Sequence, residues 1–255
     1  MNRLSSGASR EKNMPKGFAT KRNIVYFIAG LISPEVLKNA LANNAGVEAS
    51  AIKKCGVLEI RYDLFKDVAE WNGLSQKVFE LNPKALRLGT IRLVQDGGKW
   101  ENDRASERNE LFKKILSSGK TLDWIDLERG IDFSALKHPK IICSWHLFDR
   151  VPSEQELSEF AEECLESGAC GCKVAAMAHS KNDALPLYGF AKKYGKKFEL
   201  FSAFAMGEHG KESRTRSLGE GANLTYASIG EALAPGQLNI EALADNFLHL
   251  PRKWI

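Results

Sequence analysis

The chain has 255 residues, of which 44% are hydrophobic and 27% charged, a balance typical of a soluble protein with a buried core. Its net charge of +4 is too small to indicate a nucleic-acid-binding protein, although it is compatible with an anionic small substrate. No apolar run approaches the roughly 18–20 residues needed to cross a bilayer, so we expect no membrane contact.

The N-terminal segment, residues 1–22, is rich in Arg, Lys, Ser and Gly, with Glu11 as its only acid. This composition favours a disordered basic tail. An organellar targeting segment has a similar composition, and translation starting at Met14 would shorten the tail, so both alternatives stay open.

From Asn23 onward, apolar β-rich segments alternate with helix-like segments. The predicted strands are Asn23–Gly30, Gly56–Arg61, Leu86–Leu93, Leu122–Glu128, Lys140–His146, Gly171–Met177, Phe198–Phe204 and Asn223–Ala227. Eight strands alternating with helices predict an α/β fold, a (β/α)8 TIM barrel that forms a single domain over residues 23–255. No Gly-x-Gly-x-x-Gly motif follows the first strand, which argues against a dinucleotide-binding fold.

The helices between these strands carry recognisable start signals. Ser33 and Pro34 open the first helix as cap and first residue, and Ser153 with Glu156 forms a capping box before another. Further helices are predicted over Val68–Glu80, Arg104–Ser117 and Asp183–Lys193, the last with Asp183 as its cap, and a short helix is predicted after Glu128. The C-terminal helix would bury one apolar face, made of Ile240, Leu243, Ala244, Phe247 and Leu248.

The five cysteines, an odd number, predict free thiols in a reducing compartment and therefore a cytoplasmic location. Cys164, Cys170 and Cys172 are close in sequence, but their spacing does not match a Cys-x-x-Cys metal site, and His179 adds no ligand pattern. We expect neither a metal nor a cofactor.

Charged and polar residues recur where barrel strands are normally apolar. They are Glu59, Arg61 and Asp63 in one strand, Thr90 and Arg92 in the next, then Asp126 and Glu128, then Ser144 and His146, and finally Lys173. Because active sites of this barrel lie at the C-terminal ends of the strands, we expect these side chains to meet at one mouth. In the competing interpretation, Arg61 forms a buried ion pair with Glu59 or Asp126 that only stabilises the fold.

Lys173 lies inside the apolar segment Cys170–Met177, where burying a charged side chain costs free energy and a purely structural role does not account for it. Burial, together with neighbouring cations such as Arg61, would favour the neutral amine, which adds to a ketone to form an imine. The residues alone therefore suggest a Schiff-base lyase or aldolase with Lys173 as nucleophile and His146 as proton-transfer group. A lone histidine such as His146 is also common as a hydrogen-bonded core residue.

Several short motifs follow one another in a characteristic order. They are Glu-x-Arg-x-Asp at 59–63, Arg92 followed by Asp-Gly-Gly at 96–98, Ile-Asp-Leu-Glu at 125–128, Ser-Trp-His-Leu-Phe at 144–148, Cys-Lys-Val-Ala at 172–175, Met-Gly-x-x-Gly-x-x-Ser-Arg at 206–214 and Ala-Pro-Gly-Gln at 234–237. Over approximately residues 23–250, this set resembles the class I (type I) 3-dehydroquinate dehydratase family. The resemblance implies dehydration of 3-dehydroquinate to 3-dehydroshikimate in the shikimate pathway, through a lysine Schiff base and syn elimination of water.

The resemblance also implies a role for each site residue. Lys173 would form the imine, His146 would remove the adjacent proton and return one to the departing hydroxyl, and Asp96 would orient His146. The expected substrate-binding residues are Glu59 and Arg92 for ring hydroxyls, Arg61 near the imine, and Arg214 and Gln237 for the carboxylate. The resemblance further implies a cytoplasmic homodimer that takes a small-molecule substrate and needs no cofactor.

Four positions depart from the family's pattern. Leu233 and Ala222 stand where serines are usual, Leu147 replaces an acidic or amide residue, and Asp96 is one methylene shorter than Glu. These changes leave two alternatives open, namely another lysine-imine enzyme of the class I aldolase type and a non-catalytic paralogue that binds a quinate-like ligand.

Overall fold

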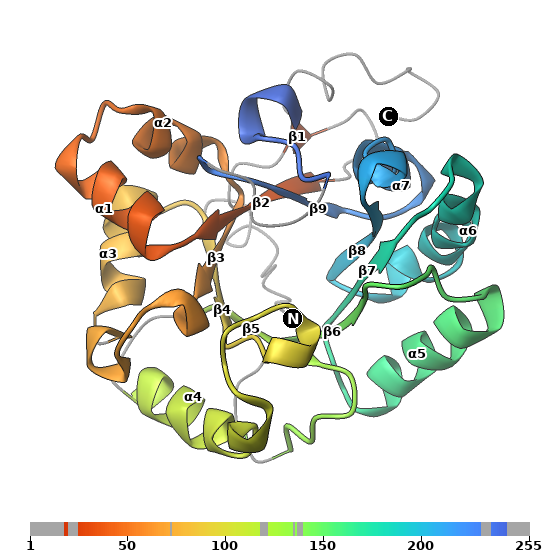
Figure 1. Cartoon of the computed structure of the whole chain (residues 1–255), viewed down its shortest axis with the longest axis horizontal. Helices are drawn as coiled ribbons and strands as arrows, with labels where there is room; N and C mark the ends of the chain where they lie inside the picture. The colour runs from red at the N-terminus through yellow and green to blue at the C-terminus, as the bar shows by residue number, and fades with distance from the viewer. Residues whose placement is uncertain are drawn as a thin grey trace, which may run out of the picture.

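A computed structural model describes residues 18–19, 25–71, 73–117, 122–134, 136, 140–230 and 236–243. Its centre is a ring of parallel strands surrounded by helices (Figure 1). The strands are β2 (Val25–Ile32), β3 (Val57–Arg61), β4 (Leu86–Thr90), β5 (Trp124–Glu128), β6 (Ile141–Leu147), β7 (Gly171–Met177), β8 (Leu200–Met206) and β9 (Leu224–Ala227). Each pairs with the next in chain order up to β8, and β9 pairs with β2. The predicted (β/α)8 barrel is confirmed.

Asn223 links the two strands β8 and β9 at the point where the ring closes. Its backbone N–H donates to the carbonyl of Phe201 at 3.1 Å, and its side-chain oxygen accepts from the Phe201 N–H at 2.8 Å. Its amide group donates to the carbonyl of Glu199 at 2.9 Å. One asparagine therefore supplies the hydrogen bonds of a short stretch of sheet.

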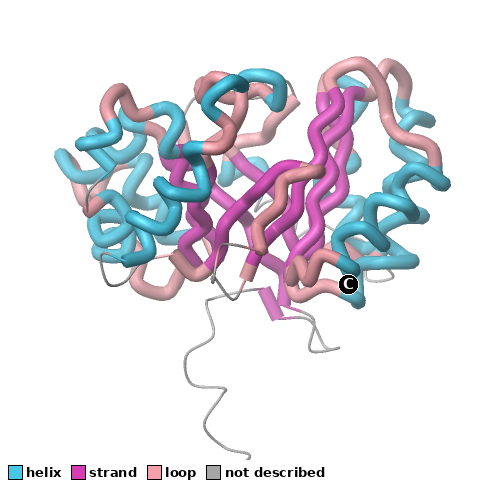
Figure 2. The backbone as a smooth tube through the Cα atoms, turned by 90° about the horizontal axis from the view of Figure 1, so that it is seen from below, coloured by secondary structure: helices cyan, strands magenta, loops and turns pink. Residues whose placement is uncertain are grey.

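The helices lie outside the strands, as the side view shows (Figure 2). They are α1 (Pro34–Ala42), α2 (Val47–Lys54), α3 (Leu74–Leu81), α4 (Glu107–Ser117), α5 (Glu154–Glu166), α6 (Leu185–Tyr194) and α7 (Ser213–Glu220). The caps at Ser33 and the capping box of Ser153 with Glu156 are confirmed. No helix of the described residues is long and apolar enough to cross a membrane.

Two predicted helices differ from those observed. The helix expected over Val68–Glu80 is split into a 3-10 turn, Val68–Trp71, and α3, because Gly73 adopts a left-handed conformation with φ 75°. Asp183 is not an N-cap; Ser180 caps a 3-10 turn, and the Asp183 carboxylate accepts from the Ser180 backbone N–H at 3.0 Å.

Parts of the prediction fall where little is described. Phe18–Ala19, from the expected tail, form a short strand, β1, that pairs antiparallel with β2. The rest of residues 1–22, the positions Ala244, Phe247 and Leu248, and the departure at Leu233 lie outside the described residues, as does part of the segment between β5 and β6.

The interior of the barrel is layered. One layer is apolar and includes Val57, Leu88, Trp124, Ile142 and Leu200. Because side chains alternate along a strand, the residues two positions further on point to the same side and form the next layer. That layer is polar in almost every strand: Glu59, Thr90, Asp126, Ser144, Lys173, Ser202 and Tyr226. The alternation of side chains along the strands therefore places a polar layer next to the apolar layer, on the side of the C-terminal ends of the strands.

Candidate active site

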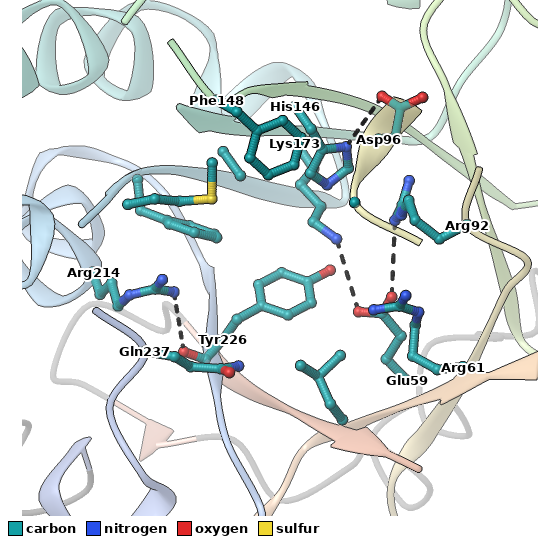
Figure 3. Close-up of a pocket in the computed structure, with 15 residues that line it drawn as sticks. Glu59, Arg61, Arg92, Asp96, His146, Phe148, Lys173, Arg214, Tyr226 and Gln237 are labelled. Atoms are coloured by element: carbon teal, nitrogen blue, oxygen red, sulfur yellow. Dashed lines mark hydrogen bonds and ion pairs between the residues drawn. The ribbon is translucent and has the colours of Figure 1, made fainter. Parts of the chain in front are cut away.

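A pocket opens above the polar layer at the C-terminal ends of the strands (Figure 3). It is lined by all eight site residues predicted from the sequence, which are Glu59, Arg61, Arg92, Asp96, His146, Lys173, Arg214 and Gln237. These residues come from strands, loops and a helix that are far apart in sequence, and the barrel brings them to one mouth. Within the described residues, no group of His, Cys, Asp and Glu is arranged to hold a metal ion.

Lys173 stands on β7 with its side-chain nitrogen among acidic side chains. Its Nζ donates to Oδ2 of Asp126 at 3.0 Å and lies 3.8 Å from Oε2 of Glu59. Its side chain is only 6% exposed. Arg61, the cation expected near it, lines the same pocket, and its guanidinium forks onto the carboxylate of Asp63 at 2.8 and 2.9 Å.

Arg92 is the centre of the buried ion pairs in this layer. Its guanidinium contacts Asp126 at 2.9 Å and Glu128 at 3.1 Å, and lies 3.8 Å from Glu59. Glu128 also pairs with Arg108, a fully buried residue of α4. Buried ion pairs of the kind that the competing interpretation assigned to Arg61 thus exist, but Arg92 forms them with Glu59 and Asp126.

This arrangement fixes the charge on Asp126. Burial by itself would raise the pKa of the Asp126 carboxyl, but Arg92 and Lys173 outweigh that effect and hold the pKa far below its usual range. Ser144 adds a hydrogen bond, with its hydroxyl donating to Oδ1 of Asp126 at 2.5 Å. Asp126 is therefore a permanent carboxylate that holds the lysine in place.

His146 stands on β6, beside β7, and its Nδ1 lies 3.8 Å from Oδ1 of Asp96. Burial, reinforced by Arg92 and Lys173, lowers the pKa of His146 well below 6.5. Burial likewise raises the pKa of the Asp96 carboxyl to about 6. At neutral pH the site therefore contains a neutral imidazole next to an ionised carboxylate.

Asp96 ends a 3-10 turn, Val94–Asp96, that passes over the mouth of the barrel. The next residue, Gly97, has φ 81°, and the Phe148 ring packs so close to it that a Cβ would lie 2.8 Å from a ring carbon. The Gly98 N–H donates to the carbonyl of Leu93 at 2.8 Å, which closes the turn. The Asp-Gly-Gly sequence thus determines where the Asp96 carboxylate lies.

Arg214 approaches the pocket from α7, on the side opposite Arg61 (Figure 3). Its Nε donates to the carbonyl of Gly236 at 3.2 Å, and its guanidinium carbon lies 4.2 Å from the centre of the Phe204 ring. No described residue offers it a carboxylate, and its Nη2 has no hydrogen-bond partner among them. Burial lowers the pKa of Arg214 to about 10. The pocket therefore contains a buried cation that lacks a counter-ion within the described chain.

Further lining residues were not predicted: Leu31, Phe148, Ala175, Phe204, Met206 and Tyr226. Most are apolar and look like ordinary core residues in the sequence. Phe148, Ala175 and Met206 do fall within the motifs that carry the family resemblance, but only their position relative to the barrel axis separates them from core positions. Tyr226 could have been found from its place two residues after Leu224, since that spacing puts it in the same layer as Lys173.

Fold and site together define a class: a (β/α)8-barrel protein whose mouth holds a buried lysine, a neutral histidine and an arginine without a carboxylate partner in the described part of the chain. The family model for type I 3-dehydroquinase matches residues 34–250. The 3-dehydroquinate dehydratase of Methanococcus maripaludis (strain C7) is 34% identical over 203 residues, which cover 76% of this chain and 88% of the relative. The 3-dehydroquinate dehydratase of Lactococcus lactis subsp. lactis (strain IL1403) is 31% identical over 217 residues, which cover 81% of this chain and 91% of the relative. The chain belongs to the type I 3-dehydroquinase family.

Solved structures agree with this fold. The 3-dehydroquinate dehydratase of Geobacillus kaustophilus HTA426 superimposes with a TM-score of 0.76 at 23% identity, covering 94% of this chain and 99% of that one. The type I enzyme of Clostridium difficile, solved with covalently modified comenic acid, gives a TM-score of 0.73 at 25% identity, covering 92% and 99%.

Proposed function

We propose that this protein dehydrates 3-dehydroquinate to 3-dehydroshikimate in the shikimate pathway, through an imine on Lys173. The observation that carries the proposal is that one pocket is lined by a buried lysine, a neutral histidine and an arginine to which no described residue offers a carboxylate. A cyclic ketone with a carboxylate and ring hydroxyls has a complementary partner for each of these groups. Family membership and the names of the relatives point to the same reaction.

The first step is the formation of the imine. The amine form of Lys173 adds to the ketone carbon, and uptake of a proton lets the ketone oxygen leave as water, which gives a protonated imine. Asp126, held as a carboxylate, positions the lysine nitrogen and balances the positive charge of the imine. The iminium withdraws electrons and makes the neighbouring C–H acidic.

His146 then transfers protons in both directions. Its pKa is lowered, so the ring is neutral and can remove the proton from the CH2 group next to the iminium carbon, which yields an enamine. The enamine nitrogen then re-forms the iminium with its lone pair, and the enamine C=C electrons form the new double bond to the following carbon. The hydroxyl on that carbon takes the proton from His146 and leaves as water. A single base on one face of the ring gives syn elimination. Asp96, 3.8 Å away, orients the imidazole and stabilises its protonated form.

Substrate binding uses the remaining groups. Arg214 pairs with the carboxylate, a charge-assisted contact, and Gln237 adds an amide beside it. Glu59 and Arg92 hold ring hydroxyls, and Arg61 lies near the imine. Hydrolysis of the conjugated imine then releases the enone product and regenerates Lys173.

The test combines turnover with trapping. Wild type is expected to convert 3-dehydroquinate to a product with enone absorbance, and borohydride with the substrate should leave a reduced adduct on Lys173 in a peptide mass map. Lys173→Ala should abolish both, whereas Lys140→Ala, which removes an exposed lysine paired with Glu199, should change neither. Substrate binding without adduct or turnover would instead establish the non-catalytic alternative. Cleavage of a sugar phosphate would establish the aldolase alternative.

Two further expectations accompany this function. The chain's described cysteines are free thiols, which agrees with the predicted cytoplasmic location. The homodimer implied by the family resemblance stays a prediction, as does the absence of nucleic-acid binding.

A further inference from the structure

Four buried polar atoms that face the pocket have no hydrogen-bond partner among the described residues: Glu59 Oε2, His146 Nδ1, Arg214 Nη2 and the Tyr226 hydroxyl. Buried polar atoms are normally paired, so a cluster of unpaired ones marks groups that await a ligand. The proposed function uses the first three groups, for a ring hydroxyl, for proton transfer and for the carboxylate. The Tyr226 hydroxyl is left without a role.

Tyr226 occupies the middle of the pocket. It stands on β9, is 3% exposed, and its ring centre lies 4.2 Å from Nζ of Lys173 and 5.9 Å from the ring of Phe204. Figure 3 shows the hydroxyl on the side of the pocket that holds Lys173 and Glu59, away from Arg214. The phenol therefore lies beside the nitrogen that would bond to the ketone carbon.

The phenol is also held in its donor form. Burial raises the pKa of Tyr226 well above 10, and the negative charges of Glu59 and Asp126 act in the same direction. Glu59 itself is 1% exposed and keeps Oε2 unpaired, 3.8 Å from Nζ of Lys173. A hydrogen-bond donor and an acceptor thus flank the same lysine nitrogen.

We propose that Tyr226 and Glu59 form a specificity-determining pair for the hydroxyl on the carbon next to the substrate's ketone, with the Tyr226 O–H donating to that hydroxyl and Glu59 accepting from it. This inference rests on the proposed function, since it takes the ketone carbon to be bonded to Lys173. A hydroxyl on the adjacent carbon is only two bonds from the ketone carbon, which brings it within reach of both groups. The pair would select α-hydroxy ketones over plain ketones, because a site built to bond a hydroxyl is left with unpaired buried groups when that hydroxyl is absent.

Tyr226→Phe removes only the hydroxyl and is compared with wild type on two substrates. They are 3-dehydroquinate and its analogue without the hydroxyl on the carbon next to the ketone. We expect kcat/KM of the variant to fall about tenfold on 3-dehydroquinate and to stay unchanged on the analogue. The melting temperature should stay constant or rise, because the hydroxyl has no partner among the described residues of the free protein.

Tyr188→Phe, on α6 and outside the pocket, is the matched control and should leave both substrates unaffected. An equal loss on both substrates, no loss on either, or a lower melting temperature for Tyr226→Phe would overturn the inference. A wild type that neither turns over 3-dehydroquinate nor forms a borohydride adduct would overturn the proposed function, and this inference with it. The two failures are therefore distinguishable.

Discussion

Lys173 and His146 lie on neighbouring parallel strands and point to the same side of the barrel, because Lys173 pairs with Ser144, two residues before His146. Since side chains alternate along a strand, this register places the proposed nucleophile and the proposed base on one face without any contribution from a loop. Sites held by strands are positioned more precisely than sites on loops. The geometry of the two groups is thus a property of the β6–β7 ladder, and substitutions that spare the ladder should leave it intact.

Asp126 is the residue of the polar layer whose loss should cost most stability. Asp126→Asn leaves Arg92 and Lys173 buried with one carboxylate fewer, and breaking a buried ion pair in this way typically costs about 3–5 kcal/mol. Activity should fall as well, because the lysine loses its anchor. Urea unfolding at neutral pH measures the free energy of unfolding.

Asp123→Asn is the matched control for that substitution. Asp123 pairs with Arg87 at 3.0 Å, but its side chain is 34% exposed, and partly exposed pairs contribute about 1 kcal/mol or less. Similar losses of unfolding free energy for both variants would contradict the prediction, since the buried ion pairs of Asp126 would then contribute no more than the partly exposed pair of Asp123.

The acid limb of the pH–rate profile should report Asp96. The pKa of His146 lies well below 6.5, so the base stays neutral through this range, whereas Asp96 takes up a proton near its pKa of about 6. We expect kcat/KM for 3-dehydroquinate to fall as the pH drops below about 6. Asp96→Asn should lower the plateau and remove this limb; a limb that persists unchanged in the variant would assign the titration to another group.

The same titration affects stability with a defined sign. The pKa of Asp96 is about 6 in the folded protein and 3.8 as an ordinary carboxyl, so the folded state binds this proton more tightly. This contribution to stability is fully present below pH 3.8 and is lost as the pH rises through 6. In urea unfolding at pH 7, the free energy of unfolding of Asp96→Asn should therefore exceed that of wild type by about 2–3 kcal/mol. The difference should vanish near pH 4.

Local patterns were sufficient to predict the barrel and most of the site. Gly171–Met177 is found as predicted, and Glu59, two residues after Val57, lies on the same interior face as Val57 by the strand period. Lys173 was identifiable because a charge within an apolar strand is costly. The strand bounds, the inward orientation of Glu59 and the burial of Lys173 depend on residues close in sequence, which is why they could be inferred from the sequence alone.

The pairing of charges could not be predicted in the same way. The competing interpretation paired Arg61 with Glu59 or Asp126, but Arg61 bonds to Asp63, because the chain leaves β3 in a 3-10 turn, Tyr62–Leu64, that brings Asp63 back to the guanidinium. Arg92 contacts those two carboxylates instead, because it follows β4, which lies between β3 with Glu59 and β5 with Asp126. Tyr226 was missed because an aromatic residue in a buried strand resembles a core residue, and only its spacing of two residues from Leu224 places it in the polar layer.

Arg214 should control substrate affinity rather than chemistry. Arg214→Met keeps the side-chain volume but removes the cation, and we expect KM for 3-dehydroquinate to rise about a hundredfold with a smaller change in kcat. The folded protein should not be weakened by the lost charge, because no described residue offers Arg214 a carboxylate. Arg216→Met, two residues further along α7 and stacked on Tyr188, is the control and should leave KM unchanged. A fall in kcat at constant KM would rule out the carboxylate role.

Gly98 is required for steric reasons, and a single methyl group should disrupt both stability and activity. A Cβ at Gly98 would lie 2.0 Å from the carbonyl oxygen of Arg92, which accepts the Trp100 N–H at 3.0 Å. Because the obstacle is backbone, the turn itself must move, and it carries both Arg92 and Asp96. Gly98→Ala should therefore cost about 2–4 kcal/mol of unfolding free energy and at least tenfold in kcat/KM.

Gly189→Ala separates this steric effect from the general effect of replacing a glycine. Gly189 lies within α6, where a Cβ would meet only Glu154 Oε1 at 3.9 Å, an ordinary contact. Alanine there should stabilise the helix by about 0.5–1 kcal/mol and leave activity unchanged. If Gly98→Ala were as stable and as active as Gly189→Ala, the turn would accommodate a Cβ at residue 98. The position of the Asp96 carboxylate near His146 would then not depend on the Asp-Gly-Gly sequence.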